Sequence, residues 1–254
     1  MPLPQVAIGR DSDDNFRSRR LIPLHDDNPT ELKPVVTGLF LATSILAFVY
    51  QLSLGTAEDR FIYAFGVIPA VIFEHTGLSP AVAAVPEWLT PFTSMFLHGG
   101  WGHLLGNMLY LWIFGNNVED ALGHVRFFFF YFICGVGAVF AHAMLDTYSL
   151  IPLIGASGAI SGILGAYLLL FPHARVLVAV PLGFAIRTLH LPTRAILVLW
   201  FALQVLNSLF APEGQAGVAW TAHVGGFLLG LVLVIFMRRP GIPLWAPRRP
   251  DDFY

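Results

Sequence analysis

One serine and one histidine in this sequence could act together as a nucleophile and its base. Ser157 follows Gly155 and Ala156 and precedes Gly158, at the start of an apolar run. A serine hydroxyl attacks a carbonyl carbon readily only when a base accepts its proton. His223 could be that base, because an unperturbed imidazole has a pKa near neutrality. The serine stretch alone favours close helix packing over catalysis, because small residues let helices approach each other in lipid.

Two further polar residues, His103 and Asn107, could stabilise a developing negative charge. They are four residues apart, so they would share one face of a helix. Both side chains could donate hydrogen bonds to the oxyanion of a tetrahedral intermediate, together with the backbone N–H of Ser157 at a helix N-terminus. Asp and Glu occur in the apolar runs only near their ends, so the sequence offers a Ser–His dyad and does not support a Ser–His–Asp triad.

These residues lie in a chain with the composition of a polytopic membrane protein. Of its 254 residues, 56% are hydrophobic and 12% are charged, whereas about a quarter of the residues in a soluble domain are charged. The formal net charge of −2 excludes the broad basic surface of a nucleic-acid-binding protein. The single cysteine, Cys134, excludes an internal disulfide. The nine histidines show no ligand spacing with an acidic partner, so we expect no metal and no cofactor.

Six apolar runs, each close to the length that crosses a bilayer, predict an all-α fold with six transmembrane helices in a bundle. The runs are residues 35–54, 93–114, 127–146, 155–171, 194–211 and 217–237. We expect the aromatic-rich connection 55–92 to lie in the membrane interface, and the interrupted segment 173–193 to form a loop against the membrane. The membrane domain would span residues 34–238, between a mostly flexible cytosolic tail at 1–33 and a short cytosolic tail at 239–254.

The distribution of basic residues predicts which way these helices run. If six helices cross the membrane, every Lys and Arg except Arg60 falls on one face, which the positive-inside rule makes cytosolic. The second, fourth and sixth helices then start at the outer face. Ser157 and His223 lie in the first turn of the fourth helix and the second turn of the sixth, so both sit about 5–10 Å below that face, given a helical rise of about 1.5 Å per residue. This matched depth favours catalysis over packing as the role of Ser157.

With these motifs in this order, the chain resembles the rhomboid family of intramembrane serine proteases, over roughly residues 35–237. The stretches that carry the resemblance are Gly155-Ala156-Ser157-Gly158, Ala222-His223-Val224-Gly225-Gly226, the His-x-x-x-Asn element within residues 98–107, and the spaced Gly115, Glu119, Gly123 and Phe127. The resemblance implies that the 55–92 loop lies half in the membrane. It also implies Ser157 as nucleophile, His223 as general base, and His103, Asn107 and the Ser157 amide as the oxyanion site.

The resemblance also implies an activity, the hydrolysis of peptide bonds in or next to transmembrane segments of other membrane proteins. The expected partners are therefore transmembrane protein substrates and the lipid bilayer, and no nucleic acid is expected. The expected location is a prokaryotic plasma membrane, with both termini in the cytosol and the active site open to the outer face. Small residues should let the helices pack and a substrate backbone reach the serine; these are Gly155, Ala156, Gly158 and Gly226.

This chain departs from the family at one position near the serine. Some bacterial members carry a tyrosine four residues after the serine, packed against the catalytic imidazole, where this chain has Ser161. We therefore expect the imidazole to be oriented by packing alone. We also expect a structural role for His98, interhelical hydrogen bonds from Gln204 and Asn207, and bonds from Glu119 to backbone amides at a cytosolic turn.

The same residues bear on two alternatives to a protease. An inactive relative that binds membrane clients should have lost the serine or the histidine, and both are present. A small transporter should show internal repeats with broken helices in paired halves, and the sequence shows no such repeat. Labelling by a fluorophosphonate probe that is lost in Ser157→Ala would separate the protease from both.

Overall fold

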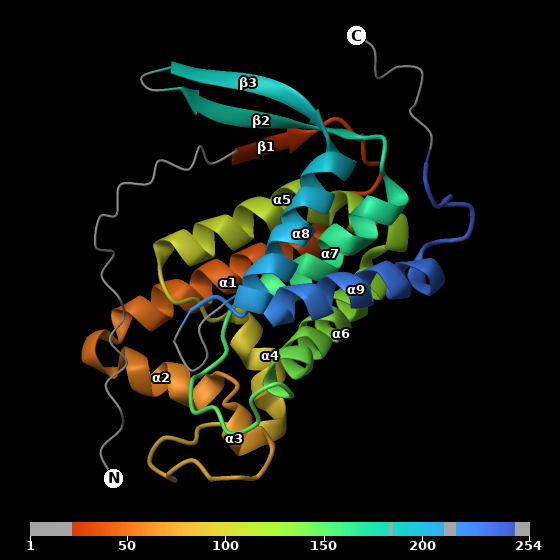
Figure 1. Cartoon of the computed structure of the whole chain (residues 1–254). Helices are drawn as coiled ribbons and strands as arrows, with labels where there is room; N and C mark the ends of the chain where they lie inside the picture. Colours follow the sequence, from red (N-terminus) through yellow and green to blue (C-terminus); the bar gives the residue numbers. More distant parts are fainter. Residues whose placement is uncertain (1–21, 183–184, 211–216, 247–254) are drawn as a thin grey trace.

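The computed structural model describes residues 22–182, 185–210 and 217–246, and it is mostly helical (Figure 1). Residues 1–21 and 247–254 of the predicted tails lie outside these ranges. The long helices are α1 Val35–Ser53, α5 Trp101–Leu122, α6 His124–Ala143, α7 Ser157–Leu170, α8 Thr193–Phe210 and α9 Trp220–Met237. The short helices are α2 Glu58–Phe65, α3 Pro69–Ile72 and α4 Thr90–Thr93, and the strands are β1 Ile22–Asp26, β2 Arg175–Leu182 and β3 Ala185–Pro192.

The long helices of the described chain correspond to the predicted apolar runs. Among the described residues, four of them, α1, α6, α8 and α9, are long and apolar enough to cross a membrane. Helix α7 is apolar but has 14 residues. Helix α5 begins at Trp101 rather than near residue 93, and it continues to Leu122. The predicted bounds of this helix are therefore wrong by about two turns, because Gly99 and Gly100 precede it and a polar segment extends it.

Helix α7, which begins at Ser157, lies at the centre of the bundle and packs against α5, α6 and α9 (Figure 1). Every residue from 158 to 167 is buried. Glycines bring the backbones of α7 and α9 into contact. A Cβ atom on Gly226 would lie 2.1 Å from the carbonyl oxygen of Gly158, and one on Gly230 would lie 2.0 Å from that of Gly162. These positions therefore determine how closely α9 approaches α7.

A three-stranded antiparallel sheet in the order β1–β2–β3 lies at one end of the bundle, while α2 and α3 lie at the other end (Figure 1). This sheet corrects two predictions. The segment 173–193 contains the hairpin β2–β3 rather than an irregular loop, and the fold is mostly helical rather than all-α. Strand β1 comes from the predicted N-terminal tail and pairs with β2, so residues 22–26 have regular structure.

The residues of the hairpin show why the sequence folds there. Val176 and Val178 are buried while Arg175 is exposed, which is the alternation of a strand with one covered face. The two prolines of the segment, Pro181 and Pro192, stand near the ends of β2 and β3, where proline is tolerated. The prolines that interrupt this segment therefore lie near the ends of strands.

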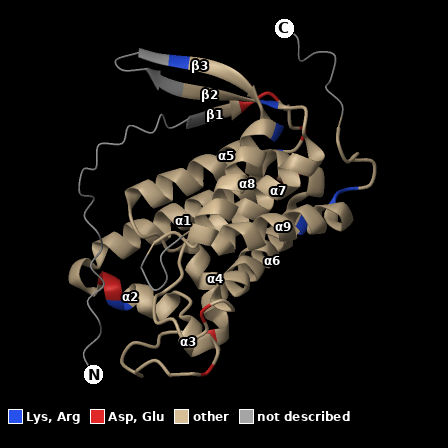
Figure 2. Ribbon diagram, viewed as in Figure 1, with Lys and Arg blue, Asp and Glu red and all other residues tan. Residues whose placement is uncertain are grey.

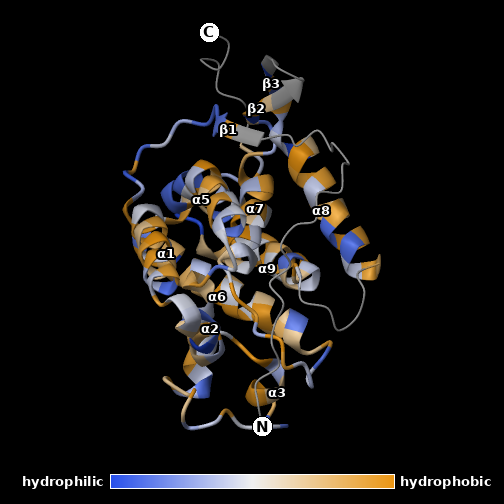
Figure 3. Cartoon of the chain, turned by 90° about the vertical axis from the view of Figure 1, so that its left-hand side faces the viewer, coloured by the Kyte–Doolittle hydropathy of each residue, from blue (hydrophilic) through white to orange (hydrophobic). Residues whose placement is uncertain are grey.

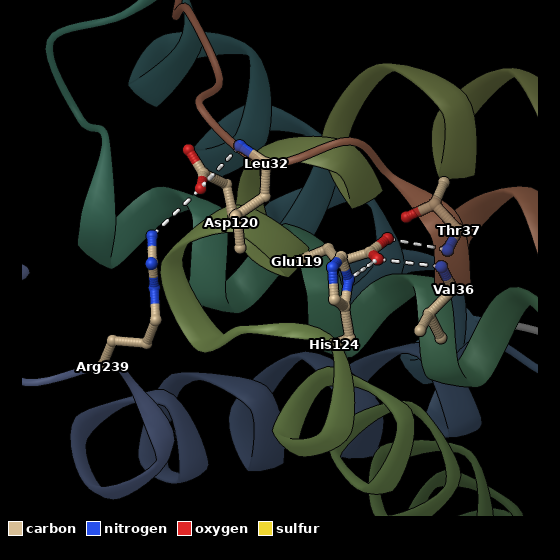
Figure 4. Close-up of polar contacts among 7 residues, drawn as sticks. All are labelled: Leu32, Val36, Thr37, Glu119, Asp120, His124 and Arg239. Atoms are coloured by element: carbon tan, nitrogen blue, oxygen red, sulfur yellow. Dashed lines mark hydrogen bonds and ion pairs between the residues drawn. The ribbon is translucent and has the colours of Figure 1, made fainter.

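Two neighbouring carboxylates at the end of α5 tie other segments to that helix (Figure 4). The buried Glu119 accepts hydrogen bonds from the backbone N–H groups of Val36 and Thr37, each 2.8 Å long, in the first turn of α1. The Nδ1 atom of His124 lies 2.6 Å from the same carboxylate. The prediction that Glu119 bonds backbone amides is confirmed, and its charge also complements the N-terminus of α1.

Asp120 joins the chain before α1 to the chain after α9. Its carboxylate accepts hydrogen bonds from the backbone N–H groups of Glu31 and Leu32. It also forms an ion pair with Arg239, with 3.0 Å between nitrogen and oxygen. Figure 4 shows this pair beside the Glu119 contacts, so the end of α5 is the common anchor of the segments before α1 and after α9.

Charged residues are sparse on the bundle and gather at its ends (Figure 2). The basic residues at the end that carries the sheet include Arg175 in β2, Arg187 in β3, Arg194 in α8, and Arg238 and Arg239 after α9. Arg60 lies in α2, at the opposite end.

Helix α8 stands at the edge of the bundle (Figure 3). Only 17% of its most apolar window is buried, against 33% for α1, α6 and α9. Its outer face carries exposed apolar side chains, including Val198, Leu199, Leu203 and Leu206. A polar residue on the inner face of α8 therefore needs a partner on the neighbouring helix.

Candidate active site

The structure brings together the serine and the histidine that the sequence singled out. Ser157 is the first residue of α7, and His223 is the fourth residue of α9. The Nε2 atom of His223 lies 2.8 Å from the hydroxyl oxygen of Ser157, which is hydrogen-bonding distance. The imidazole is buried, with 8% of its residue surface exposed. A base in this position can accept the hydroxyl proton directly.

Local backbone geometry explains how Ser157 reaches this position. Gly155 has a φ of +119°, a backbone conformation that L-residues with a side chain rarely adopt, and the chain turns there into α7. The contact between Gly158 and Gly226 then brings α9 close enough for His223 to meet the hydroxyl. The Ser157 amide belongs to the first turn of α7, so it has no helical acceptor and can donate to another group.

His103 and Asn107 both lie beside the turn that precedes Ser157. A Cβ atom on Gly155 would lie 2.7 Å from the Nε2 atom of His103 and 3.8 Å from the Nδ2 atom of Asn107. The Nδ1 atom of His103 accepts a hydrogen bond of 3.3 Å from the amide of Gly99, which assigns the ring proton to Nε2. Two side-chain N–H groups of α5 therefore lie next to the serine turn.

The Asn107 amide group is buried and lacks a protein acceptor. Its residue surface is 8% exposed, and its Nδ2 atom has no hydrogen-bond partner among the described residues. A buried donor without a partner costs free energy, so an amide placed in this way is suited to a ligand that brings an acceptor.

A small cavity opens beside Ser157. Its lining includes Gly135, Ala138, Gly158 and Ala222, together with the larger side chains of Leu153 and Ile154. The volume of the cavity is about 30 Å³. The cavity can therefore accept a small side chain or a bare backbone more readily than a large one.

A hydrogen bond, and not packing alone, orients the imidazole of His223, so the expectation that packing alone orients it is wrong. The Nδ1 atom lies 2.8 Å from the Oε1 atom of Gln204 on α8. The indole of Trp200 stacks on the ring at a centroid distance of 5.9 Å, and Trp220 meets it edge-on at 6.1 Å. Ser161, at the position of the family's tyrosine, instead donates a 2.6 Å hydrogen bond to the carbonyl of Ser157.

Sequence reasoning missed the two tryptophans, although their spacing carried a signal. Trp220 precedes His223 by three residues, and Trp200 precedes Gln204 by four, so each pair shares one helix face. The hydrogen bond of Gln204 to a neighbouring helix was expected, but its partner was not. The same expectation for Asn207 is wrong, because its side chain is exposed on α8.

His98 lies near the site without touching the serine. It is fully buried, and its ring centroid is 5.1 Å from that of His103. The side chain of Gln51 on α1 donates to the His98 carbonyl at 2.7 Å and accepts from its amide at 3.3 Å. These contacts hold the entry of α5 against α1, as a structural residue would.

The rhomboid domain family matches residues 85–240 of this chain. This range contains every residue of the candidate active site described here except Gln51. The chain is 35% identical over 137 residues to the rhomboid protease GluP of Bacillus subtilis, covering 54% of this chain and 24% of GluP. It is 32% identical over 143 residues to the mitochondrial rhomboid protein 1 of Saccharomyces cerevisiae, covering 55% of this chain and 39% of that protein.

A third relative matches along most of its length. YdcA, a rhomboid relative from Bacillus subtilis, is 31% identical over 211 residues, which are 80% of this chain and 90% of YdcA. This chain thus covers less than half of GluP and of the yeast protein, and nearly all of YdcA. The chain belongs to the rhomboid family.

Proposed function

We propose that this protein is an intramembrane serine endopeptidase that cleaves peptide bonds in or next to transmembrane segments of other membrane proteins. The observation that carries the proposal is the 2.8 Å contact between His223 Nε2 and Ser157 Oγ, inside an apolar helical bundle. Membership of the rhomboid family supports it, and GluP is named as a protease.

The proposed topology has six crossings, made by α1, α5, α6, α7, α8 and α9, with residues 34–238 as the membrane domain. We place both termini in the cytosol and assign the sheet to the cytosolic side, because the basic residues of the described chain gather at that end of the bundle. Ser157 then opens toward the outer face. The match along nearly all of bacterial YdcA supports a prokaryotic plasma membrane as the location.

In the proposed acylation step, Ser157 Oγ attacks the scissile carbonyl carbon while its proton passes to His223 Nε2. The carbonyl π pair moves to oxygen, and the oxyanion accepts hydrogen bonds from the Ser157 amide, His103 Nε2–H and Asn107 Nδ2–H. The C–N bond then breaks. The leaving amine takes the proton from His223, and the other half of the substrate remains as an ester of Ser157.

In the deacylation step, a water molecule replaces Ser157 as the nucleophile. His223 Nε2 accepts a proton from the water molecule as the water oxygen attacks the ester carbon, and the same donors hold the second oxyanion. The bond to Ser157 Oγ breaks, Oγ regains the proton from His223, and the carboxylic acid product leaves. The balance is one water consumed per peptide bond, with no redox change.

The substrate helix must open locally for this chemistry. A carbonyl inside an α-helix is bonded to the amide four residues on, so it can reach Ser157 only after that turn unwinds. The cavity beside Ser157 has a volume of about 30 Å³, which favours small residues at the cut. We therefore propose substrates with small or helix-breaking residues near the scissile bond.

The test is labelling of the detergent-solubilised protein by a fluorophosphonate, whose fluoride leaves as Ser157 Oγ bonds to phosphorus. We expect labelling of the wild type and of Ser44→Ala, which removes another buried serine hydroxyl on α1, and none of Ser157→Ala. Cleavage of a membrane-inserted substrate should follow the same pattern. A folded wild type that is not labelled, or labelling that persists in Ser157→Ala, would contradict the proposal.

A further inference from the structure

Gln204 is the one polar side chain of α8 that reaches the candidate active site in the described chain. It lies on the inner face of the helix with 5% of its surface exposed, and its Oε1 atom is 2.8 Å from His223 Nδ1. The opposite ring nitrogen, Nε2, is 2.8 Å from Ser157 Oγ. The imidazole therefore bridges an amide on α8 and the hydroxyl on α7.

The orientation of the Gln204 amide follows from its second contact. Its Nε2 atom donates a hydrogen bond of 3.3 Å to the carbonyl oxygen of Trp200, one turn earlier in α8. If the amide were flipped, its oxygen would face the Trp200 carbonyl, to which an oxygen without a proton cannot donate. The bond to Trp200 therefore assigns Nε2 to that side and Oε1 to the side that faces the imidazole. An amide oxygen only accepts, so His223 Nδ1 must carry the proton.

This assignment has a chemical consequence at the other end of the ring. In a neutral imidazole one nitrogen carries the proton and the other has the free lone pair. With the proton on Nδ1, the lone pair of Nε2 points at the Ser157 hydroxyl and can accept its proton. The opposite tautomer would place an N–H group against that hydroxyl and leave no base.

The aromatic neighbours cannot replace Gln204 in this role. Trp200 stacks on the ring and Trp220 meets it edge-on, so both restrict its plane. Neither contact distinguishes Nδ1 from Nε2. Within the described part of the chain, Gln204 Oε1 is the only acceptor within hydrogen-bond distance of Nδ1.

We propose that Gln204 is a positioning residue that fixes the reactive tautomer of His223 and stabilises the imidazolium formed when Nε2 takes the Ser157 proton. The proposal rests on the proposed dyad and extends it to a Ser157–His223–Gln204 chain. A hydrogen bond to the charged ring is stronger than one to the neutral ring, so the contact tightens as the proton moves. The other titratable side chains that act electrostatically on His223 are His103 on α5 and His142 on α6.

Three variants on α8 separate positioning from a merely structural hydrogen bond. Gln204→Leu removes the acceptor at similar size, and Gln204→Glu restores an acceptor and adds a negative charge. Asn207→Leu is the matched control, because it removes an exposed amide one turn along the same helix. For each variant, we would measure the rate of fluorophosphonate labelling, kcat and KM on a membrane-inserted substrate from about pH 5 to 9, and Tm in the same detergent.

We expect Gln204→Leu to lower kcat and the labelling rate by roughly 10- to 100-fold with KM nearly unchanged, as when an orienting partner of an active histidine is lost. Gln204→Glu should recover most of the rate. It should also move the acidic limb of the pH–rate profile to higher pH, because a carboxylate favours the imidazolium. Asn207→Leu should match the wild type.

Two outcomes would overturn the inference. The first is a folded Gln204→Leu variant that is labelled at the wild-type rate. The second is an equal loss of kcat in both Gln204 variants, with a common fall in Tm and no shift of the acidic limb of the pH–rate profile. If Gln204→Leu fails to fold, the acidic limb of Gln204→Glu decides alone. Failure of the dyad itself is distinguishable, because the wild type would then resist labelling or Ser157→Ala would retain it.

Discussion

The hydroxyl of Tyr167 donates a 2.5 Å hydrogen bond to the carboxylate of Asp26, and so ties strand β1 to the helix that begins at Ser157. The same carboxylate oxygen accepts a 2.8 Å bond from the side chain of Asn117 on α5. The other oxygen of Asp26 is buried without a partner among the described residues. The N-terminal strand is therefore held on the bundle by a carboxyl group that is only half satisfied.

Burial raises the pKa of Asp26 from its ordinary value of 3.8 to about 6, against the smaller opposite effect of the Tyr167 hydrogen bond. The folded state therefore binds the Asp26 proton more tightly than the unfolded state does. The stability that this proton contributes is complete below about pH 4 and is lost as the pH rises through 6. A shift of this size corresponds to about 3 kcal/mol.

We therefore expect Asp26→Asn to raise the Tm at pH 8 and to remove a decline in Tm between about pH 4 and 7. Asparagine keeps the acceptor for Tyr167 and Asn117 without the charge. The measurement is thermal unfolding in detergent across this pH range. Asp59→Asn, at an exposed position in α2, is the control. A decline that survives Asp26→Asn would refute the assignment.

Glu119 supports a second prediction, on stability. Removing its carboxylate in Glu119→Ala leaves the amides of Val36 and Thr37 buried without acceptors, so the free energy of unfolding should fall by about 3 kcal/mol. Glu119→Gln keeps one acceptor oxygen and should lose less. Thermal unfolding of both variants, with Glu74→Gln at an exposed position as control, measures this order. Equal Tm values for the alanine variant and the wild type would contradict it.

Gly226 supports a third prediction, which links packing to chemistry. The Cβ atom of Gly226→Ala would lie 2.1 Å from the carbonyl oxygen of Gly158, so α9 must move away and carry His223 from Ser157. We expect the rate of labelling by fluorophosphonate to fall by roughly 100-fold, as when a reacting group is misplaced by about 1 Å. The free energy of unfolding should also fall by about 1–3 kcal/mol. Gly38→Ala on α1 meets nothing within 4 Å and should be neutral or slightly stabilising. Undiminished labelling of Gly226→Ala would show that the helices need not touch.

The sequence predicted the helical bundle because each long helix is an apolar run that can be recognised locally. The end of α5 could not be recognised in this way. Residues 116–120 look like a polar turn, but Glu119 and Asn117 are buried, and their partners Val36 and Asn28 lie more than 80 positions earlier. Only the tertiary structure supplies those partners, so the helix continues where its composition suggests an end.

The candidate site also combines features that the sequence predicts with features that only the tertiary structure supplies. The matched depth of Ser157 and His223 followed from topology, because it depends only on where two helices start. The contact of His223 with Gln204 depends on the rotation of α8 about its axis, which apolar periodicity does not fix in a helix with apolar residues on most of its faces. Sequence therefore located the pair and missed what orients it.

Asn107 supports a fourth prediction, on the oxyanion site. Its Nδ2 donates to no acceptor in the described chain, so Asn107→Ala breaks no hydrogen bond of the resting protein. We expect an unchanged Tm and KM but a fall in kcat of roughly 10²- to 10³-fold, the loss of one oxyanion donor. Asn207→Ala is the control. A fall in Tm that accompanies the loss of kcat would assign Asn107 a structural role instead.

The cavity beside Ser157 supports a prediction about substrates. A cut within a transmembrane segment needs an unwound turn, and a pair of glycines makes unwinding easier than a pair of leucines by about 2 kcal/mol. Replacing two such residues by leucine next to the cut should lower kcat/KM by roughly 10- to 30-fold. A leucine at the scissile position would also have to enter the cavity beside Ser157, whose volume is about 30 Å³. As a control, the same replacements at the far end of the segment should leave kcat/KM unchanged. If replacement at the cut also leaves kcat/KM unchanged, neither unwinding nor the cavity limits the reaction.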